Sequence, residues 1–152
     1  MIVETTPVKT KKPFGFYVCA LGFTFERMAF YTAKYMLAIW IATRTTASTG
    51  GLGMTTAQGA MISAYFVAAT YITPTIGGLI ADYWISPRIC VPVGMLMMGV
   101  GYSLAFWANS MSMVIVMTVL VALGTGLFKG NLSGVNGLLF DDEKALNEAF
   151  SI

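Results

Sequence analysis

The chain has 152 residues, of which 57% are hydrophobic and only 11% are charged. Soluble domains carry about a quarter charged residues, so this composition indicates a membrane protein. The net charge of +2 argues against a nucleic-acid partner, and two cysteines without any histidine offer neither a disulfide framework nor a metal-ligand pattern. No nucleophile–base pair, metal cluster or phosphate loop indicates an enzyme, and no cofactor is expected.

The sequence predicts an all-α membrane protein with four transmembrane helices. Apolar runs predict helices over residues 14–41, 57–82, 89–107 and 111–140, each long enough to cross a bilayer. Residues 42–56, rich in Thr, Ser and Gly, are expected to form a loop, and residues 82–88 a short turn. Residues 1–13 are interpreted as a cytoplasmic tail, 14–140 as the four-helix segment, and 141–152 as a cytoplasmic loop with the start of a fifth helix.

The first predicted helix carries three charged residues, Glu26, Arg27 and Lys34, within its apolar run. A charge near the middle of a membrane helix costs about 2.5–3.5 kcal/mol on insertion scales unless it faces protein, water or a partner. Glu26, Phe30 and Lys34 follow at i, i+4 and i+8, and Arg27, Tyr31 and Lys34 at i, i+4 and i+7. Both series fall on neighbouring stripes of one helix face, which is therefore expected to line a wet cavity.

Two further residues at membrane depth are candidates for the same cavity. Lys129 lies deep in the fourth predicted helix, with no carboxylate close by in sequence. It either snorkels to the interface or faces the cavity, balanced by Glu26 or by a substrate carboxylate. Tyr71 precedes Pro74 by three residues, and it is interpreted either as packing or as part of the site.

The segment GGLIADYWISPR, residues 77–88, joins the second and third predicted helices. The pair Gly77 and Gly78 permits close contact between helices. Asp82 and Arg88 are expected at the cytoplasmic rim, where they can pair across the turn or cap a helix end.

This segment resembles the loop motif of the major facilitator superfamily, GGxxADRxxGRR. Gly77, Gly78, Ala81, Asp82 and Arg88 match the motif, whereas Tyr83, Ser86 and Pro87 depart from it.

Other stretches resemble the proton-dependent oligopeptide transporters within that superfamily. The first predicted helix is similar to the family's ExxERFxYY motif through Glu26, Arg27 and Tyr31. GLFKGNLSGVNGLLF resembles GLFKPNISxxxGxLY, YITPTIGG contains the matching Tyr71, and NEAFSI resembles the start of the family's fifth helix. In the fourth predicted helix the matching residues are Lys129, Asn131, Ser133 and Gly137. In the first predicted helix the sequence departs from the family, with Phe23 for the first glutamate, Met28 for Phe, Phe30 for the first Tyr and Lys34 for an arginine.

The resemblance implies proton-driven uptake of di- and tripeptides by a fold of twelve helices in two six-helix halves. It implies that Glu26, Arg27 and Lys129 take part in proton coupling. It further implies that Tyr31, Lys34, Tyr71 and Asn131 bind substrate, and that Gly77, Gly78, Asp82 and Arg88 belong to the gating loop. Phe23 in place of the first glutamate leaves open an altered proton stoichiometry or another substrate.

Two interpretations of function follow. The first is the N-terminal part of a secondary active transporter, most simply for di- and tripeptides and alternatively for another small organic anion. The second is a non-transporting membrane fragment, such as an insertion or assembly intermediate held by biogenesis machinery. The expected partners are protons, peptides, the lipid bilayer, and either the remaining helices of the transporter or a membrane-protein chaperone.

The basic residues predict an orientation in the plasma (inner) membrane. One side holds Lys9, Lys11, Lys12, Arg88 and Lys144, whereas the other holds Arg44. The positive-inside rule therefore places the N-terminus in the cytoplasm and residues 42–56 outside.

Cysteine labelling tests this orientation. In a background without Cys19 and Cys90, single cysteines at Ser48 and Ser86 should react with a membrane-impermeant reagent from opposite sides of the membrane. Labelling of the Ser48 position only from the cytoplasmic side would overturn the assignment.

Overall fold

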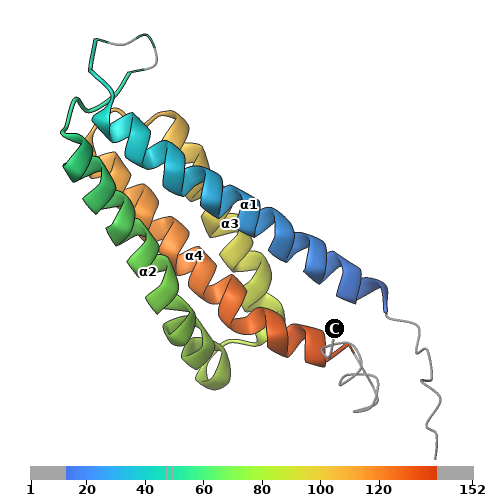
Figure 1. Ribbon diagram of the computed structural model, residues 1–152. Coiled ribbons are helices and arrows are strands. Elements are labelled where there is room, and N and C mark those ends of the chain that lie inside the picture. The colour runs from blue at the N-terminus through green and yellow to red at the C-terminus, as the bar shows by residue number, and fades with distance from the viewer. Residues whose placement is uncertain (1–12, 47, 49, 140–152) are drawn as a thin grey trace, which may run out of the picture.

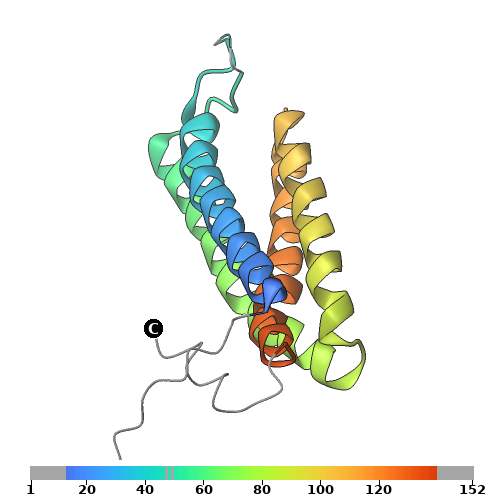
Figure 2. The same ribbon diagram turned by 90° about the vertical axis from the view of Figure 1, so that its right-hand side faces the viewer.

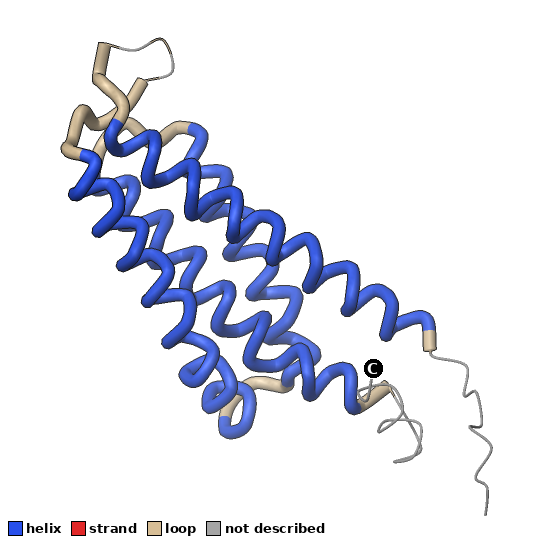
Figure 3. The backbone as a smooth tube through the Cα atoms, viewed as in Figure 1, coloured by secondary structure: helices blue, strands red, loops and turns tan. Residues whose placement is uncertain are grey.

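The structure is a computed structural model that describes residues 13–46, 48 and 50–139, and these residues form a helical bundle (Figure 1). Helix α1 spans Phe14–Ala42, α2 Thr56–Tyr83, α3 Pro87–Phe106 and α4 Met111–Gly137. Within this described part the chain contains no strand, as the tube in Figure 3 shows, so the all-α prediction is confirmed. The expected tail and the expected start of a fifth helix lie outside the described residues.

The helix ends agree closely with the predicted ones and have local causes. α2 begins with a capping box, in which Thr55 accepts from the backbone N–H of Gln58 and the Gln58 side chain accepts from Thr55. α3 begins at Pro87, which suits the first helical position because its missing N–H would be unpaired there anyway. α4 ends at Gly137, earlier than predicted, and is followed by a turn at residues 138–139.

Three of the four helices, α2, α3 and α4, are long and apolar enough to cross a membrane by length and composition. α1 is the exception to the expected four spans. It has 29 residues, so its length suffices, but Glu26, Arg27 and Lys34 make it less apolar than the others. Charged side chains at membrane depth need protein or water against them. α1 lies alongside α2 in the bundle, so α2 can cover part of its surface.

The helices form two pairs, α1 with α2 and α3 with α4, which approach one another at the end where α2 connects to α3 (Figure 2). α4 provides the link because it packs extensively on both α3 and α2, whereas α1 packs mainly on α2. Toward the other end an apolar groove of about 380 Å³ lies between α1 and the α3–α4 connection. Its walls include Leu37, Trp40, Ala105 and Met117.

Glycines set the close approach of α4 to its two neighbours. A methyl group on Gly77 of α2 would overlap the carbonyl group of Gly126 in α4. Gly94 of α3 faces α4 in the same way, since its methyl group would lie 2.6 Å from the carbonyl oxygen of Gly124. Small residues thus allow backbone contact, as is common between membrane helices. The expected close contact is confirmed for Gly77, whereas a methyl group on Gly78 would meet nothing within 4 Å.

The adjacent glycines provide a matched test of this packing. Gly77→Ala should lower the free energy of unfolding in detergent by about 1–3 kcal/mol, because the methyl group forces backbone apart. Gly78→Ala should be neutral or stabilising by about 0.5–1 kcal/mol, because alanine favours the helix and the space is open. Equal effects of the two substitutions on thermal unfolding would contradict the proposed contact.

Candidate functional site

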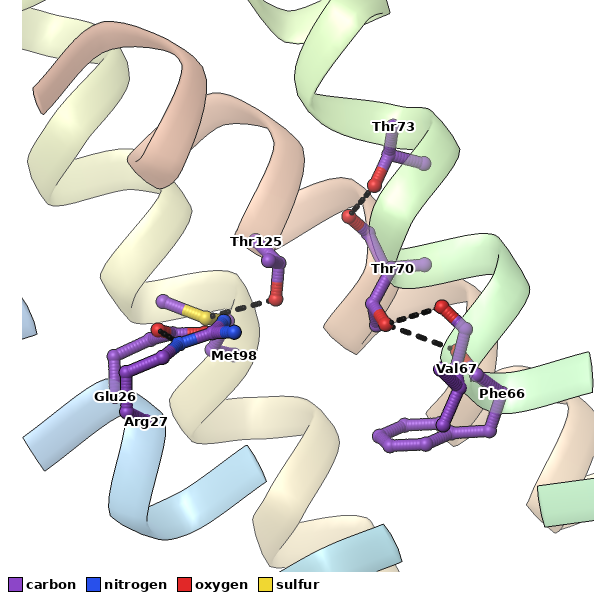
Figure 4. Close-up of polar contacts among 9 residues, drawn as sticks. Glu26, Arg27, Phe66, Val67, Thr70, Thr73, Met98 and Thr125 are labelled. Atoms are coloured by element: carbon purple, nitrogen blue, oxygen red, sulfur yellow. Dashed lines mark hydrogen bonds and ion pairs between the residues drawn. The ribbon is translucent and has the colours of Figure 1, made fainter. Parts of the chain in front are cut away.

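The site begins with an ion pair between neighbouring residues of α1. Nε and Nη2 of Arg27 donate to the two carboxylate oxygens of Glu26. Glu26 is only 6% exposed, and the Arg27 side chain 17%. Figure 4 shows both side chains extending from α1 toward α3, in the region where the Thr125 hydroxyl of α4 donates to the sulfur of Met98 at 3.3 Å. The pairing removes the cost of an isolated buried carboxylate.

An aromatic bridge connects this ion pair to α2 and α4. The Arg27 guanidinium lies 4.8 Å from the centre of the Phe30 ring, and Phe30 meets Tyr71 edge-on at 6.2 Å between centroids. On the far side of the bridge, Nζ of Lys129 lies 5.0 Å from the centre of the Tyr71 ring. Two cations on different helices are therefore separated by two aromatic rings, which attract them through their faces.

The structure thus brings together four predicted site residues, Glu26, Arg27, Tyr71 and Lys129, from three helices. It does not pair Lys129 with Glu26, whose carboxylate is taken by Arg27. Lys129 is instead half-buried and directed at the Tyr71 ring of α2, and its orientation toward a cavity stays a prediction. Whether Lys129 takes part in proton coupling stays a prediction.

Tyr31 and Lys34 lie farther along α1. Tyr31 is 48% exposed and, with Arg27, lines an open recess of about 460 Å³ whose other walls are Phe23, Thr24, Met28 and Thr32. Nζ of Lys34 lies over the Tyr35 ring of the same helix at 5.3 Å. Both side chains are accessible, so their predicted substrate contacts remain compatible with the geometry and untested by it.

Asn131 occupies a buried position between α4 and α2, with 4% of its surface exposed. Its side-chain nitrogen donates to the carbonyl oxygen of Gly77 at 3.1 Å and to that of Leu127 at 2.8 Å. These bonds hold α4 against α2 beside the glycine contact. The structure thus shows that Asn131 joins α4 to α2. Its predicted contact with substrate stays a prediction.

The loop between α2 and α3 holds the remaining predicted residues. Asp82 and Arg88 are both exposed and form no ion pair with each other. Neither caps a helix, because the α2 C-cap is Trp84 and the α3 N-cap is Ser86. A gating role for this loop is untested by the described residues.

Several residues of the site were not singled out from the sequence. Phe30, expected on the face that lines a wet cavity, is instead fully buried and stacks on Phe66 at 5.7 Å. Ser63 and Thr73 bond across helices, Ser63 to the Lys34 carbonyl at 2.9 Å and Thr73 to the Ala122 carbonyl at 2.6 Å (Figure 4 shows Thr73). Ser63 and Thr73 could have been predicted from the sequence as contacts between helices, because hydroxyl groups inside apolar membrane helices tend to donate to carbonyl oxygens.

The sequence is similar to the sequences of several named peptide transporters. A "Di-/tripeptide transporter" of Lactococcus lactis is 28% identical over 128 residues, covering 84% of this chain and 26% of the relative. "Dipeptide and tripeptide permease A" of Erwinia pyrifoliae is 27% identical over 144 residues, covering 93% and 28%. "Peptide transporter YePEPT" of Yersinia enterocolitica is 31% identical over 119 residues, covering 76% and 22%. No family model and no solved structure matches.

Over most of its length the chain is thus similar to proteins named as di- and tripeptide transporters and peptide permeases, which supports the resemblance to the proton-dependent oligopeptide transporter family. It is a multi-pass integral membrane protein. It spans about a quarter of the length of the curated relatives that it matches, with shares of 26% and 28% in the two relatives from Lactococcus and Erwinia.

The ion pair sets the charge balance of α1. A carboxylate and a guanidinium that neutralise each other leave α1 with one net positive charge, on Lys34. Lys34 of α1 and Lys129 of α4 thus lack a carboxylate partner among the described residues.

The contribution of the ion pair to stability can be measured by substituting one of its two residues. Arg27→Met should lower the free energy of unfolding in detergent by about 3–5 kcal/mol, because a buried carboxylate is left without a cation. The double variant Glu26→Gln/Arg27→Met removes both charges and should recover most of that loss. Equal stability of the single variant and the parent chain would show that Glu26 does not depend on Arg27.

Proposed function

We propose that this chain forms part of a secondary active transporter that takes up di- and tripeptides together with protons. The supporting observation is the buried Glu26–Arg27 pair, joined through Phe30 and Tyr71 to Lys129, in a chain whose relatives are named for di- and tripeptides. Glu26 is the buried carboxyl group of α1, and we assign it the role of proton carrier.

The substrate chemistry fits the distribution of charge. A peptide is a zwitterion, so it needs groups of both signs at separated positions. Lys129 and Lys34 are half-buried cations without a carboxylate partner among the described residues, and each is suited to the peptide carboxylate. Tyr31 and Tyr71, 48% and 54% exposed, present ring surface and hydroxyl groups for the rest of the peptide.

Transport also requires parts that lie beyond these helices. Facilitator folds place the substrate between two halves that rock about a central site. The proposed transporter therefore combines this bundle with further helices that cover the polar face of α1. We propose the plasma (inner) membrane as its location, with the N-terminus in the cytoplasm, in accord with the distribution of basic residues.

Uptake measurements with the protein expressed from its complete reading frame test the proposal. Glu26→Gln should abolish proton-driven peptide uptake, because the amide cannot exchange a proton, while counterflow without a gradient is retained. Lys129→Ala should weaken uptake by removing the cation over Tyr71. Full uptake by Glu26→Gln at every pH would assign Glu26 a structural role only. Absence of peptide uptake by the parent protein would favour the non-transporting fragment.

A further inference from the structure

Phe30, on α1, is a buried ring in the middle of the candidate site. It is 1% exposed, and it stacks on Phe66 of α2 with 5.7 Å between ring centroids. Phe66 is itself fully buried, with 0% of its surface exposed. Packing on both sides therefore fixes the Phe30 ring and leaves it no surface for a solute. Phe30 can act on the site only through the side chains that it contacts.

Tyr71, on α2, is a contact of Phe30 that reaches the surface. It is 54% exposed, and its ring meets the Phe30 ring at 6.2 Å with an angle of 78° between the ring planes. This edge-to-face geometry is one of the arrangements that aromatic pairs prefer. Within the described residues Phe30 is the aromatic partner of Tyr71. Because Phe30 is held in the core, the contact sets the plane of the exposed Tyr71 ring.

The side chain of Lys129, on α4, depends on the plane of that ring. Its Nζ lies 5.0 Å from the centre of the Tyr71 ring, and no carboxylate among the described residues pairs with it. The face of an aromatic ring attracts a cation, whereas the edge of the ring is positive. A tilt of Tyr71 would therefore weaken the attraction and let the flexible lysine side chain take another rotamer. The place of a charge on α4 thus depends on a ring of α1, through a ring of α2.

We propose that Phe30 is a positioning residue, which fixes the Tyr71 ring and through it the place of the Lys129 charge. An aliphatic side chain in its place would stay buried but could not impose the edge-to-face geometry on Tyr71. The inference rests on the proposed function for its purpose, since Lys129 is a cation suited to the peptide carboxylate. Phe30 then determines where that carboxylate is bound. The position of Lys129 itself can be measured without transport.

A carbon-13 NMR measurement tests the position of Lys129 directly. The lysines of the purified protein, expressed from its complete reading frame, are reductively methylated with carbon-13, and the Lys129 signal is assigned with Lys129→Arg. The Tyr71 ring current should displace this signal upfield, and Tyr71→Leu should remove the displacement. In Phe30→Leu the signal should move toward its position in Tyr71→Leu, because the ring is no longer held. Phe30→Met, which also lacks a ring, is measured in parallel, so that a folding defect in one variant leaves the other to decide.

Two controls separate positioning from general packing. Leu37→Ala removes the same number of carbon atoms as Phe30→Leu from the same buried cluster of α1, and it should leave the Lys129 signal in place. The signal of Lys34, whose Nζ lies 5.3 Å from the centre of the Tyr35 ring, serves as an internal reference in every variant. A Lys129 signal that is not displaced in the parent protein, is unmoved in both Phe30 variants, or is moved as far by Leu37→Ala would overturn the proposal.

Uptake gives a second measurement. Phe30→Leu should raise the KM for a dipeptide about 3- to 10-fold with the maximal rate unchanged, whereas Leu37→Ala should leave the KM unchanged. Competition by the corresponding dipeptide amide, which has no carboxylate for Lys129, should be equally strong in the parent protein and in Phe30→Leu. Equal weakening for the peptide and its amide would count against the proposal. If the parent protein took up no peptide, the proposed function would fail, and the methyl signal alone would decide the role of Phe30.

Discussion

A buried carboxylate must keep a cation beside it, and in this chain the requirement is met by the next residue. The Glu26–Arg27 pair lies where isolated charge would be least tolerated, and both oxygens of the carboxylate are bonded. Arg27 pairs with its chain neighbour while its guanidinium lies 4.8 Å from the centre of the Phe30 ring. Phe30 thus contacts both the charged site and Phe66 of α2, where α1 packs on α2.

The second constraint is the close contact of α4 with both α2 and α3. Glycines at the crossing points bring backbones together, and at that distance Asn131 reaches the Gly77 carbonyl and Thr73 reaches the Ala122 carbonyl. α2, α3 and α4 consequently form a firm unit, whereas α1 is held mainly by α2. α1, the helix with the most charged residues in its apolar run, is thus also the helix that packs least against the others.

The sequence predicted the helices well because long apolar runs between polar turns have few other structures open to them in a bilayer. It also grouped Glu26, Arg27 and Lys129 in one predicted charge cluster, and the structure connects these residues through Phe30 and Tyr71, whereas their role in proton coupling stays a prediction. It did not predict that Arg27 rather than Lys129 holds Glu26, because helix periodicity places residues on faces without fixing side-chain rotamers. It also did not single out Tyr102 of α3, whose hydroxyl is buried without a hydrogen-bond partner, because a tyrosine in an apolar helix looks the same whether or not its hydroxyl is bonded.

The two cations of the site are compensated to different degrees, and this difference organises its chemistry. Arg27 has a full carboxylate, whereas Lys129 has only the face of the Tyr71 ring, an interaction of about 0.5–2 kcal/mol. An anion that approaches the bundle therefore gains more at Lys129, whose charge no carboxylate among the described residues offsets, than at Arg27. The two cations lie on opposite sides of the Phe30–Tyr71 bridge, so the uncompensated charge is separated from the paired one by two aromatic rings.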